Sequence, residues 1–552
     1  MLAIIISSFT LLLLFISFGF LFQKITQIDL SFADLILMGL VITNSLTAWL
    51  SLFLPINSSL LILLVVACAF ILFRNKIYPG VILHFIKKNT VLSVIIAGFF
   101  LIALIVSAGP PLNYDTGLYH LQMIKWIEKY PVVPGLGNLH GRLGFNSNIL
   151  LVNALSSFEP VFGQEIFSLN LLLFAILTCY LISSSFQVYK STGISNILLF
   201  NLIALIFLIR LENLSSPSPD YIATVVPLYI FIRVFNFPED NEGFDFKPVI
   251  PLALIAVYMV TVKLSTLPIL LLFLLLLWKY RRAILPFLPK MALACSVIIL
   301  PWLIRNVILT GWLLYPFPHL NLFGFDWKIP IAKVIFEKES VTGWARIRGI
   351  DPHVSAGMTY QWIPKWWRYQ SSTDRRFLFC SFLLPVLGII ALIFKFVHLR
   401  FFKKSVLITA YAGLLFWFIM APDIRFGESF VLVCGFSFLI YVPFSFESTG
   451  SNLKYILVLV VLLFYDAFFN RVALRTVARD QMEPFHSLLV PEKIAIPANV
   501  RFVNRAIKGG MVLSPIYSDQ CFDQNIPCTP FYDSTLMQRG ITLDHGFKPF
   551  PR

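Results

Sequence analysis

The sequence predicts an all-α polytopic membrane protein. Hydrophobic residues make up 58% of the 552 residues and charged residues only 13%, whereas soluble domains are about a quarter charged. The apolar residues form continuous runs long enough to cross about 30 Å of hydrocarbon as helices. This continuity argues against transmembrane β-strands, in which apolar and polar residues alternate. The number of runs predicts a bundle of about 12 to 14 transmembrane helices.

The apolar runs recur along most of the chain, and we count about fourteen of them. The first run has no cationic segment before it and no small-residue cleavage site after it, so it indicates a spanning helix rather than a removed signal peptide. The stretch 249–278 is the least regular, because Lys263 stands near its middle. The expected spans are residues 2–23, 34–54, 58–73, 90–108, 164–186, 194–210, 220–236, 249–263, 266–278, 287–305, 376–396, 405–421, 425–446 and 455–470.

Basic residues indicate which side each connection faces. Short segments such as "KYRR" (279–282) and "KFVHLRFFKK" (395–404) are rich in Lys and Arg, as cytoplasmic loops are. Strict alternation of the spans then places the loops 109–163, 211–219 and 306–375 and the tail 471–552 together on the outer side. The net charge of +15 fits this bias, and no basic face with interleaved aromatic residues predicts a nucleic-acid partner.

These assignments divide the chain into three parts. We expect N-terminal transmembrane helices in residues 1–89, a transmembrane core in residues 90–470, and an outer C-terminal segment in residues 471–552. The outer segment contains Cys521 and Cys528 in "DQCFDQNIPC". Since disulfides form in oxidising compartments, this pair is a candidate disulfide.

The first outer loop contains a cluster of titratable side chains in "NYDTGLYHLQMIKWIEKY" (113–130). The pattern after Thr116 predicts an amphipathic helix that lies in the membrane interface with its apolar face down. Asp115 stands at the N-terminus of this helix, where the helix dipole favours an ionised carboxylate. A simple helix N-cap is the alternative interpretation of Asp115.

Further charged residues stand at span ends on the same side. Asp220, near Glu212, begins the seventh span, and Lys263 stands where a charge is costly and usually functional, although a snorkelling lysine is the alternative. Arg305 and Asn306 end the tenth span. Arg425 belongs to the turn "APDIRFGES", for which a simple polar turn with a surface ion pair is the alternative. The Trp and Tyr residues of loop 306–375 indicate either interfacial anchors or sugar stacking.

This combination suits group transfer from a phosphate-linked donor. A carboxylate can accept the proton of an attacking hydroxyl, and Arg or Lys can hold the departing phosphate. No Gly-rich phosphate loop or dinucleotide-binding fingerprint is present.

The motifs "YDTGLYHLQMIKWI", "VKLSTLPILLL", "PWLIRNVILTGWLLYPF" and "APDIRFGESFVL" occur in an order that resembles the GT-C class of membrane glycosyltransferases. Protein O-mannosyltransferases and lipid A aminoarabinose transferases are members of this class. The resemblance covers about residues 90–450, and the tail resembles that of a bacterial family of uncharacterised relatives.

The resemblance implies an inverting transfer with Asp115 as the base. It implies that Lys263, Arg305 and Arg425 hold the donor phosphate, and we add the adjacent His120 and Asn306 as substrate-binding candidates. Where many members have an acidic pair, this chain has Asp115 followed by Thr116, so either Asp220 or Glu128 is the candidate second acid; of the two, we take Asp220 as the second catalytic residue. One carboxylate is a poor divalent-cation site, so the sequence requires no cofactor and leaves a metal ion open. About three spans precede the loop, where the class has one.

The resemblance therefore implies a glycosyltransferase in a bacterial inner membrane, with its active site on the periplasmic or extracellular face. Its partners are the lipid bilayer, a polyprenyl-phosphate-linked sugar donor, and a glycolipid, polysaccharide or protein acceptor. One alternative is a polysaccharide polymerase or ligase, which takes a diphosphate-linked donor. The other is a transporter or lipid flippase, although such proteins place charges at mid-membrane and often contain repeats.

Overall fold

The computed structural model describes the chain except for residues 75–88, 211–213, 238–244, 447–451, 472–473, 475–485 and 551–552. The described part is predominantly helical, and nine of its helical segments are long and apolar enough to cross a membrane. They identify a multi-pass, all-α membrane protein. These segments contain α1 (Leu2–Thr26), α2 (Phe32–Leu50), α5 (Thr90–Ser107), α9 (Leu169–Thr192), α14 (Arg281–Ile284) with α15 (Leu288–Thr310), α19 (Ser372–Ile393), α20 (Phe401–Met420), α21 (Ile424–Gly435) with α22 (Phe438–Tyr441), and α23 (Asn452–Phe469).

Shorter helices fill the remaining predicted spans. They are α3 (Ser58–Arg74), α10 (Asn196–Arg210), α11 (Pro219–Phe235), α12 (Val249–Val262) and α13 (Ile269–Lys279). Each apolar run identified in the sequence therefore coincides with a helix. The irregular stretch is broken at Lys263, which has extended backbone angles and ends α12 before a 3-10 turn at Leu264–Thr266.

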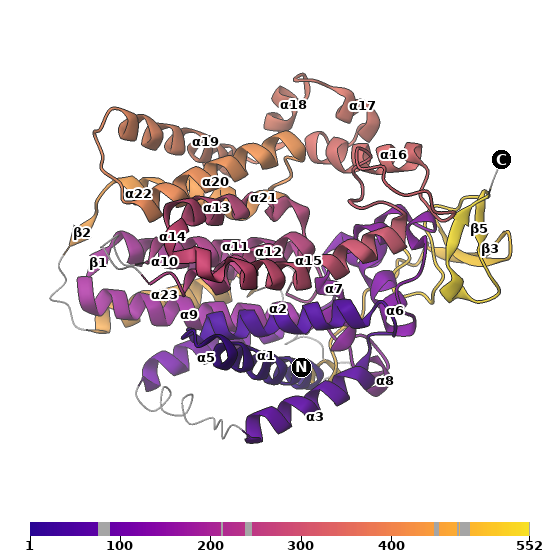
Figure 1. Cartoon of the computed structure of the whole chain (residues 1–552), viewed down its shortest axis with the longest axis horizontal. Coiled ribbons are helices and arrows are strands. Elements are labelled where there is room, and N and C mark those ends of the chain that lie inside the picture. Colours follow the sequence, from indigo (N-terminus) through magenta and orange to yellow (C-terminus); the bar gives the residue numbers. More distant parts are fainter. Residues whose placement is uncertain are drawn as a thin grey trace.

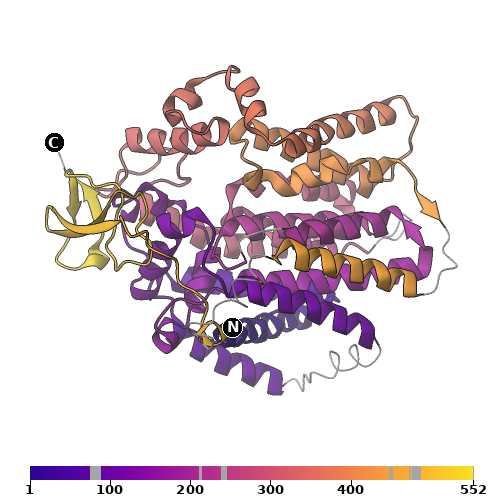
Figure 2. The ribbon, with the colours of Figure 1, turned by 180° about the vertical axis from the view of Figure 1, so that it is seen from behind.

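The spanning helices pack side by side (Figures 1 and 2). The pair α1 and α2 is held at close range by glycines, because a Cβ on Gly39 would lie 1.8 Å from the carbonyl oxygen of Phe15. Small residues at such crossings let backbones approach closely. Deeper in the bundle, the Asp34 carboxylate accepts hydrogen bonds of 2.6 Å from the Tyr229 hydroxyl and from Arg233, and joins α2 to α11.

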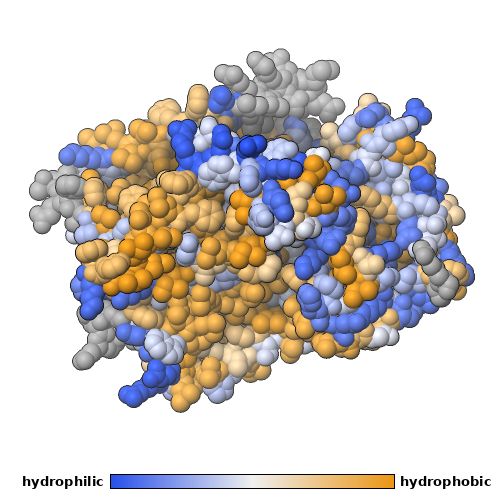
Figure 3. Space-filling view, turned by 90° about the horizontal axis from the view of Figure 1, so that it is seen from above, coloured by the Kyte–Doolittle hydropathy of each residue, from blue (hydrophilic) through white to orange (hydrophobic). Residues whose placement is uncertain are grey.

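The outer surface of the bundle is apolar. Figure 3 shows a broad hydrophobic surface over the helices, with hydrophilic residues gathered toward the end that carries the tail. Large apolar side chains such as Phe464, which is 72% exposed, lie on helices of this bundle. Such exposure suits side chains that contact lipid.

The predicted outer loops and the tail meet at one end of the molecule, on the right in Figure 1. The loops form a π-helical turn, η1 (Thr116–His120), followed by α6 (Leu121–Lys129), η2 (Leu136–Asn138), η3 (Gly141–Phe145), α7 (Ile149–Leu155), α8 (Glu159–Phe162), α16 (Ile331–Arg346), α17 (Pro352–Gly357) and α18 (Trp362–Tyr369). At the other end, β1 (Ile194–Ser195) pairs antiparallel with β2 (Ser445–Phe446).

The tail contains β-structure that the sequence analysis did not anticipate. After the short helix α25 (His486–Leu489), β3 (Arg501–Ile507) pairs antiparallel with β4 (Gly510–Ile516), and β5 (Leu536–Gln538) pairs antiparallel with β6 (Phe547–Pro549). The domain boundaries predicted near residues 89 and 470 fall beside segments outside the described residues, and stay predictions.

The helix that follows Asp115 is buried within the protein, whereas the predicted interfacial helix would expose its polar side to water. Residues 121–127 of α6 are all buried. The reason is that the tail covers the polar side of this helix, and Lys125 donates a hydrogen bond of 2.6 Å to the Asp523 carboxylate. An amphipathic pattern thus marks a helix packed between the bundle and the tail.

Candidate functional site

The end of the molecule that carries the outer loops contains a cavity with about 1250 Å³ of empty space, part of it open solvent at the mouth. Its walls come from η1, η3, α11, the turn between α12 and α13, α16, α20 and α21. The charged side chains of the lining are Asp115, Arg142, Asp220, Lys263 and Lys338. Most of the other lining residues are apolar, among them Phe317, Val341, Phe416, Trp417, Met420 and Phe426.

Asp115 enters this cavity from the start of the π-helical turn. Its backbone N–H donates to the Asn113 side chain at 2.9 Å, so Asn113 satisfies the helix end. The Asp115 side chain makes no capping hydrogen bond. The alternative interpretation of Asp115 as a simple cap is therefore wrong, and its carboxylate is free to face the cavity.

The same capping contacts bring the second carboxylate close to the first. Ser218 accepts hydrogen bonds from the Asp220 backbone N–H at 3.2 Å and from the Asn113 side chain at 3.1 Å. The start of α11 is thereby joined to the start of the Asp115 helix. The two acids, 105 positions apart in the sequence, therefore share one cavity.

Each acid faces cations. Lys263 pairs with the Asp220 carboxylate and lies over the Phe426 ring, 4.1 Å from its centre. Arg425 lies 3.8 Å from both Asp115 and Asp220. Burial of Lys263 at the broken end of α12 thus reflects a charge pair rather than a snorkelling side chain.

Arg425 is itself held by the turn that precedes α21. Asp423 caps this helix by accepting from the Arg425 backbone N–H at 3.1 Å, and its carboxylate lies 3.3 Å from the Arg425 Nε. Asp423 is buried and also pairs with Arg348 at 3.0 Å. The alternative of a simple surface turn therefore does not describe this segment.

Arg142 is a cavity residue that the sequence analysis missed. It lies 3.6 Å from Asp115 and 3.5 Å from Glu337. Burial raises the pKa of Glu337, and the nearby Arg142 partly offsets this effect. A signal was available in the sequence, because Arg142 is the one Lys, Arg, Asp or Glu residue between positions 131 and 158. Glu337 and Lys338 lie in the mixed-charge stretch "FEKES", which offers no comparable signal.

His120 is buried beside the cavity rather than on its wall. Neither ring nitrogen has a hydrogen-bond partner among the described residues, and the ring packs 4.3 Å from that of Tyr119, which does line the cavity. Burial lowers the pKa of His120 to about 4, although Asp115 and Asp220 oppose this shift. His120 is therefore a neutral imidazole near pH 7.

Arg305 and Asn306, also predicted to bind substrate, do not line this cavity. The physical reason is that α15 continues to Thr310 and turns both side chains into the protein. Arg305 donates to Asn146 at 3.0 Å and to the Ser51 hydroxyl at 2.6 Å. Asn306 accepts from the Asn146 side chain at 2.7 Å. Both residues thus brace the loop that follows η3.

The two candidates for the second acid lie in different parts of the structure. Asp220 shares the cavity with Asp115, whereas the buried Glu128 side chain interacts with Ser157, Glu165, Glu159 and Lys125, none of which lines that cavity. Glu212 lies outside the described residues. The assignment of Glu128 as a partner of Asp115 is therefore corrected.

The cavity fits a metal ion poorly. In the part of the chain that the structure describes, no group of three or more His, Cys, Asp and Glu side chains has the arrangement of a metal site. The two carboxylates of the cavity already face Arg142, Lys263 and Arg425, and these positive charges oppose the binding of a second cation.

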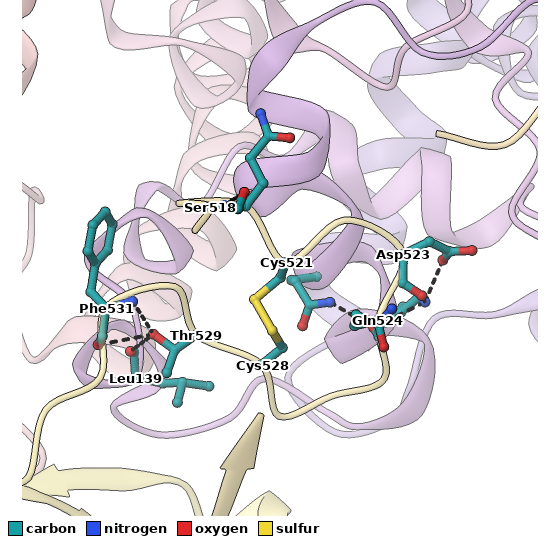
Figure 4. The surroundings of a disulfide bond; sticks show 11 residues. Leu139, Ser518, Cys521, Asp523, Gln524, Cys528, Thr529 and Phe531 are labelled. Atoms are coloured by element: carbon teal, nitrogen blue, oxygen red, sulfur yellow. Dashed lines mark hydrogen bonds and ion pairs between the residues drawn. A yellow bond between two sulfur atoms is a disulfide. The ribbon is translucent and has the colours of Figure 1, made fainter. Parts of the chain in front are cut away.

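The predicted disulfide joins Cys521 and Cys528 (Figure 4). Both cysteines are buried where the tail packs against the outer loops.

A family model described as a domain of unknown function, DUF8201, matches residues 1–432. The chain belongs to the DUF8201 family. No curated protein matches the chain, and no solved structure matches it. The part that matches the DUF8201 model includes Asp115, Arg142, Asp220, Lys263 and Arg425, so the charged lining of the cavity belongs to this domain. The disulfide-bonded tail lies beyond it.

Proposed function

We propose that this protein is a GT-C-type membrane glycosyltransferase that moves a sugar from a polyprenyl-phosphate donor to a glycolipid, polysaccharide or protein acceptor. The observation that carries the proposal is that one cavity is lined both by a cluster of charged side chains and by a larger set of apolar side chains. A polyprenyl-phosphate sugar combines the same two kinds of surface, an anionic head and a hydrocarbon tail. Preformed pockets with a few converging polar groups are the usual form of such sites.

The cavity gathers four cations that a donor phosphate could contact. The cations are Arg142, Lys263, Lys338 and Arg425, and the carboxylates of the cavity are Asp115 and Asp220. Arg142 and Arg425 face these carboxylates and also pair with Glu337 and Asp423, respectively. Lys263 pairs with Asp220. Lys338 has no ion-pair partner among the described residues, so it is the cation most available to a phosphate. Arg and Lys stabilise a phosphate leaving group through charge-assisted hydrogen bonds.

Asp115 is the better candidate for the base. Its carboxylate lies 3.6 and 3.8 Å from the two nearest cations, beyond hydrogen-bond distance. Asp220, by contrast, is in direct contact with Lys263. We therefore assign Asp115 to proton transfer, and Asp220 to holding Lys263 and Arg425 in place.

The proposed reaction is a single displacement at the anomeric carbon. Asp115 accepts the proton of the acceptor hydroxyl as the acceptor oxygen bonds to that carbon. The bond from the carbon to the phosphate oxygen breaks, and polyprenyl phosphate leaves with the electron pair. The product has the inverted anomeric configuration.

We place this cavity on the periplasmic or extracellular face of a bacterial inner membrane. Two features support this side: the long loops and the tail gather at the cavity end, and the tail contains a disulfide, which is typical of oxidising compartments.

The test is sugar transfer by the purified protein in liposomes with a labelled polyprenyl-monophosphate sugar. Asp115→Asn should lower the transfer rate at least about a hundredfold, because general-base catalysis contributes roughly 10²–10⁴-fold. The matched control is Asp544→Asn, which removes an equivalent charge from a half-exposed residue of the tail and should transfer at the wild-type rate.

Other outcomes would refute parts of the proposal. Full transfer by Asp115→Asn would remove Asp115 as the base. Transfer from a diphosphate-linked oligosaccharide alone would favour a polymerase or ligase. Movement of the donor across the bilayer without a new glycosidic bond would favour a transporter.

A further inference from the structure

The tail loop between Ser518 and Cys528 packs along the helix that carries Asp115 (Figure 4). At the start of this helix, the Tyr114 hydroxyl donates to the Asp519 carboxylate, and the Gln520 side chain donates to the Tyr114 carbonyl oxygen at 3.1 Å. Two residues further along the loop, the Phe522 backbone N–H donates to the Gly117 carbonyl oxygen at 2.9 Å. The contacts therefore flank Asp115 on both sides.

The same loop also holds the next two turns of the helix. Gln122 donates to the Gln524 carbonyl oxygen at 2.8 Å, and Lys125 donates to the Asp523 carboxylate at 2.6 Å. Loop residues 519–524 thus contact the helix from residue 114 to residue 125. Such a run of contacts fixes both the position and the rotation of the helix.

The π-helical turn explains why the loop binds at this point. A π-turn interrupts the regular α-helical ladder and leaves backbone groups that need other partners. The Phe522 N–H donates to the Gly117 carbonyl, a backbone group of this turn. Gly117 also provides the space, because a Cβ at this position would lie 2.6 Å from the Gln520 side-chain oxygen and 3.0 Å from Ile494.

The loop leaves the Asp115 carboxylate facing the cavity. This carboxylate lies near Arg142 and Arg425, neither of which belongs to the loop. The cations and the apolar wall of the cavity come from η3, α12, α16, α20 and α21. A shift of the helix would therefore move the carboxylate relative to the rest of the site.

The disulfide fixes the shape of this loop. Cys521 and Cys528 close the segment that contains Phe522, Asp523 and Gln524. Directly after Cys528, Thr529 donates a hydrogen bond of 2.8 Å to the Leu139 carbonyl oxygen, in the first outer loop. The disulfide therefore connects the contacts on the Asp115 helix to a second anchor on the same outer loop.

We propose that the disulfide-bonded loop 518–528 is a positioning element for Asp115, and that sugar transfer depends on the Cys521–Cys528 bond. Asp519, Gln520 and Phe522 are its positioning residues. Closing the bond joins two thiols and passes two protons and two electrons to a disulfide oxidant by thiol–disulfide exchange. The dependence of transfer rests on the proposed function, whereas the positioning of the helix does not.

The experiment compares full-length variants by amide hydrogen exchange over residues 114–129 and by transfer kinetics. Gly117→Ala, which adds a Cβ against the loop, and Cys521→Ala/Cys528→Ala, which removes the bond, should each speed exchange of this helix at least about tenfold. Each should lower kcat by about ten- to a hundredfold, since a displacement near 1 Å has effects of this size. The donor KM should stay within twofold, because the phosphate-binding cations lie on other elements.

Two further variants separate positioning from general stability. Asp519→Asn keeps an oxygen that accepts from the Tyr114 hydroxyl and should behave as wild type. Asp519→Ala loses this contact, and should speed exchange and lower kcat in the same direction as Gly117→Ala but by a smaller factor. Arg539→Gln removes a tail contact with Asp326 that lies away from the Asp115 helix, and should leave exchange at residues 114–129 unchanged.

Hydrogen exchange tests the positioning of the helix, and transfer kinetics test its effect on catalysis. Unchanged exchange in Gly117→Ala and in the double cysteine variant would overturn the positioning, whatever the transfer rate. Faster exchange with a wild-type kcat would overturn the dependence of transfer on the loop. Faster exchange in a protein whose wild-type form transfers no sugar would support the positioning and refute the proposed function.

Discussion

Replacing Lys263 by methionine should destabilise the protein through Asp220. The two side chains are mostly buried, with exposed fractions of 18% and 11%. Removal of one member of a buried pair costs about 3–5 kcal/mol, because the other charge stays buried without its partner. Methionine keeps most of the length of the side chain, so the change isolates the charge.

Arg425 reduces this cost. It lies 3.8 Å from Asp220, and two unit charges about 4 Å apart attract by roughly 4 kcal/mol at an effective dielectric constant of about 20. We therefore expect Lys263→Met to lower the free energy of unfolding by about 2–3 kcal/mol. In Asp220→Asn/Lys263→Met both charges are absent, and the expected loss is about 1 kcal/mol.

The assay is a double-mutant cycle with Asp220→Asn, Lys263→Met and the double variant. Unfolding in mixed detergent micelles, followed by tryptophan fluorescence, gives the four free energies. Since the double variant is expected to lose about 1–2 kcal/mol less than Lys263→Met alone, the coupling energy should be at least about 1–2 kcal/mol, within the range for residues in one charge network. Additive effects of the two substitutions, within about 0.5 kcal/mol, would refute the argument that the pair acts as a unit.

Two other predictions follow from the buried groups around the site. Burial raises the pKa of Glu128 from 4.5 to about 8, with Glu165 and Glu159 adding to the shift; a raised carboxyl pKa stabilises the fold fully below pH 4.5 and loses this effect as pH rises toward 8. Glu128→Gln should therefore flatten the fall in unfolding free energy between pH 4.5 and 8, and an unchanged pH profile would contradict the assignment. Arg305→Met should lower the melting temperature, because Arg305 donates hydrogen bonds to Asn146 and Ser51, and should leave the donor KM within twofold. A large rise in the donor KM at an unchanged melting temperature would instead indicate that Arg305 binds the donor.

The sequence predicted the helices well because long apolar runs depend on composition alone. It also identified Asp115, Asp220, Lys263 and Arg425, since charges at the ends of apolar runs stand out in such a chain. These four residues come together because capping side chains of different helices bond to each other, as Asn113 does to Ser218. No spacing in the sequence reveals such contacts.

The misplaced residues have a common cause. Arg305 and Asn306 were placed at the end of a span, and one further helical turn of α15 directs them into the protein. The amphipathic pattern after Asp115 predicts a polar face exposed to water, yet the tail, about 400 residues later in the chain, covers that face. Local periodicity distinguishes the apolar face of a helix from its polar face. Which segment of the chain packs on each face is determined by the tertiary structure.

The most direct test of the central claim is to locate the donor. A polyprenyl-monophosphate sugar with a photoreactive group on its first isoprene unit should label α20 near Phe416 and Met420, or α16 near Val341, which are apolar residues of the cavity lining. An excess of unlabelled donor should abolish this labelling. Labelling confined to other sites, such as the cavity near His398 and Lys403 at the opposite end of the molecule, would contradict the assignment of the outer cavity as the donor site.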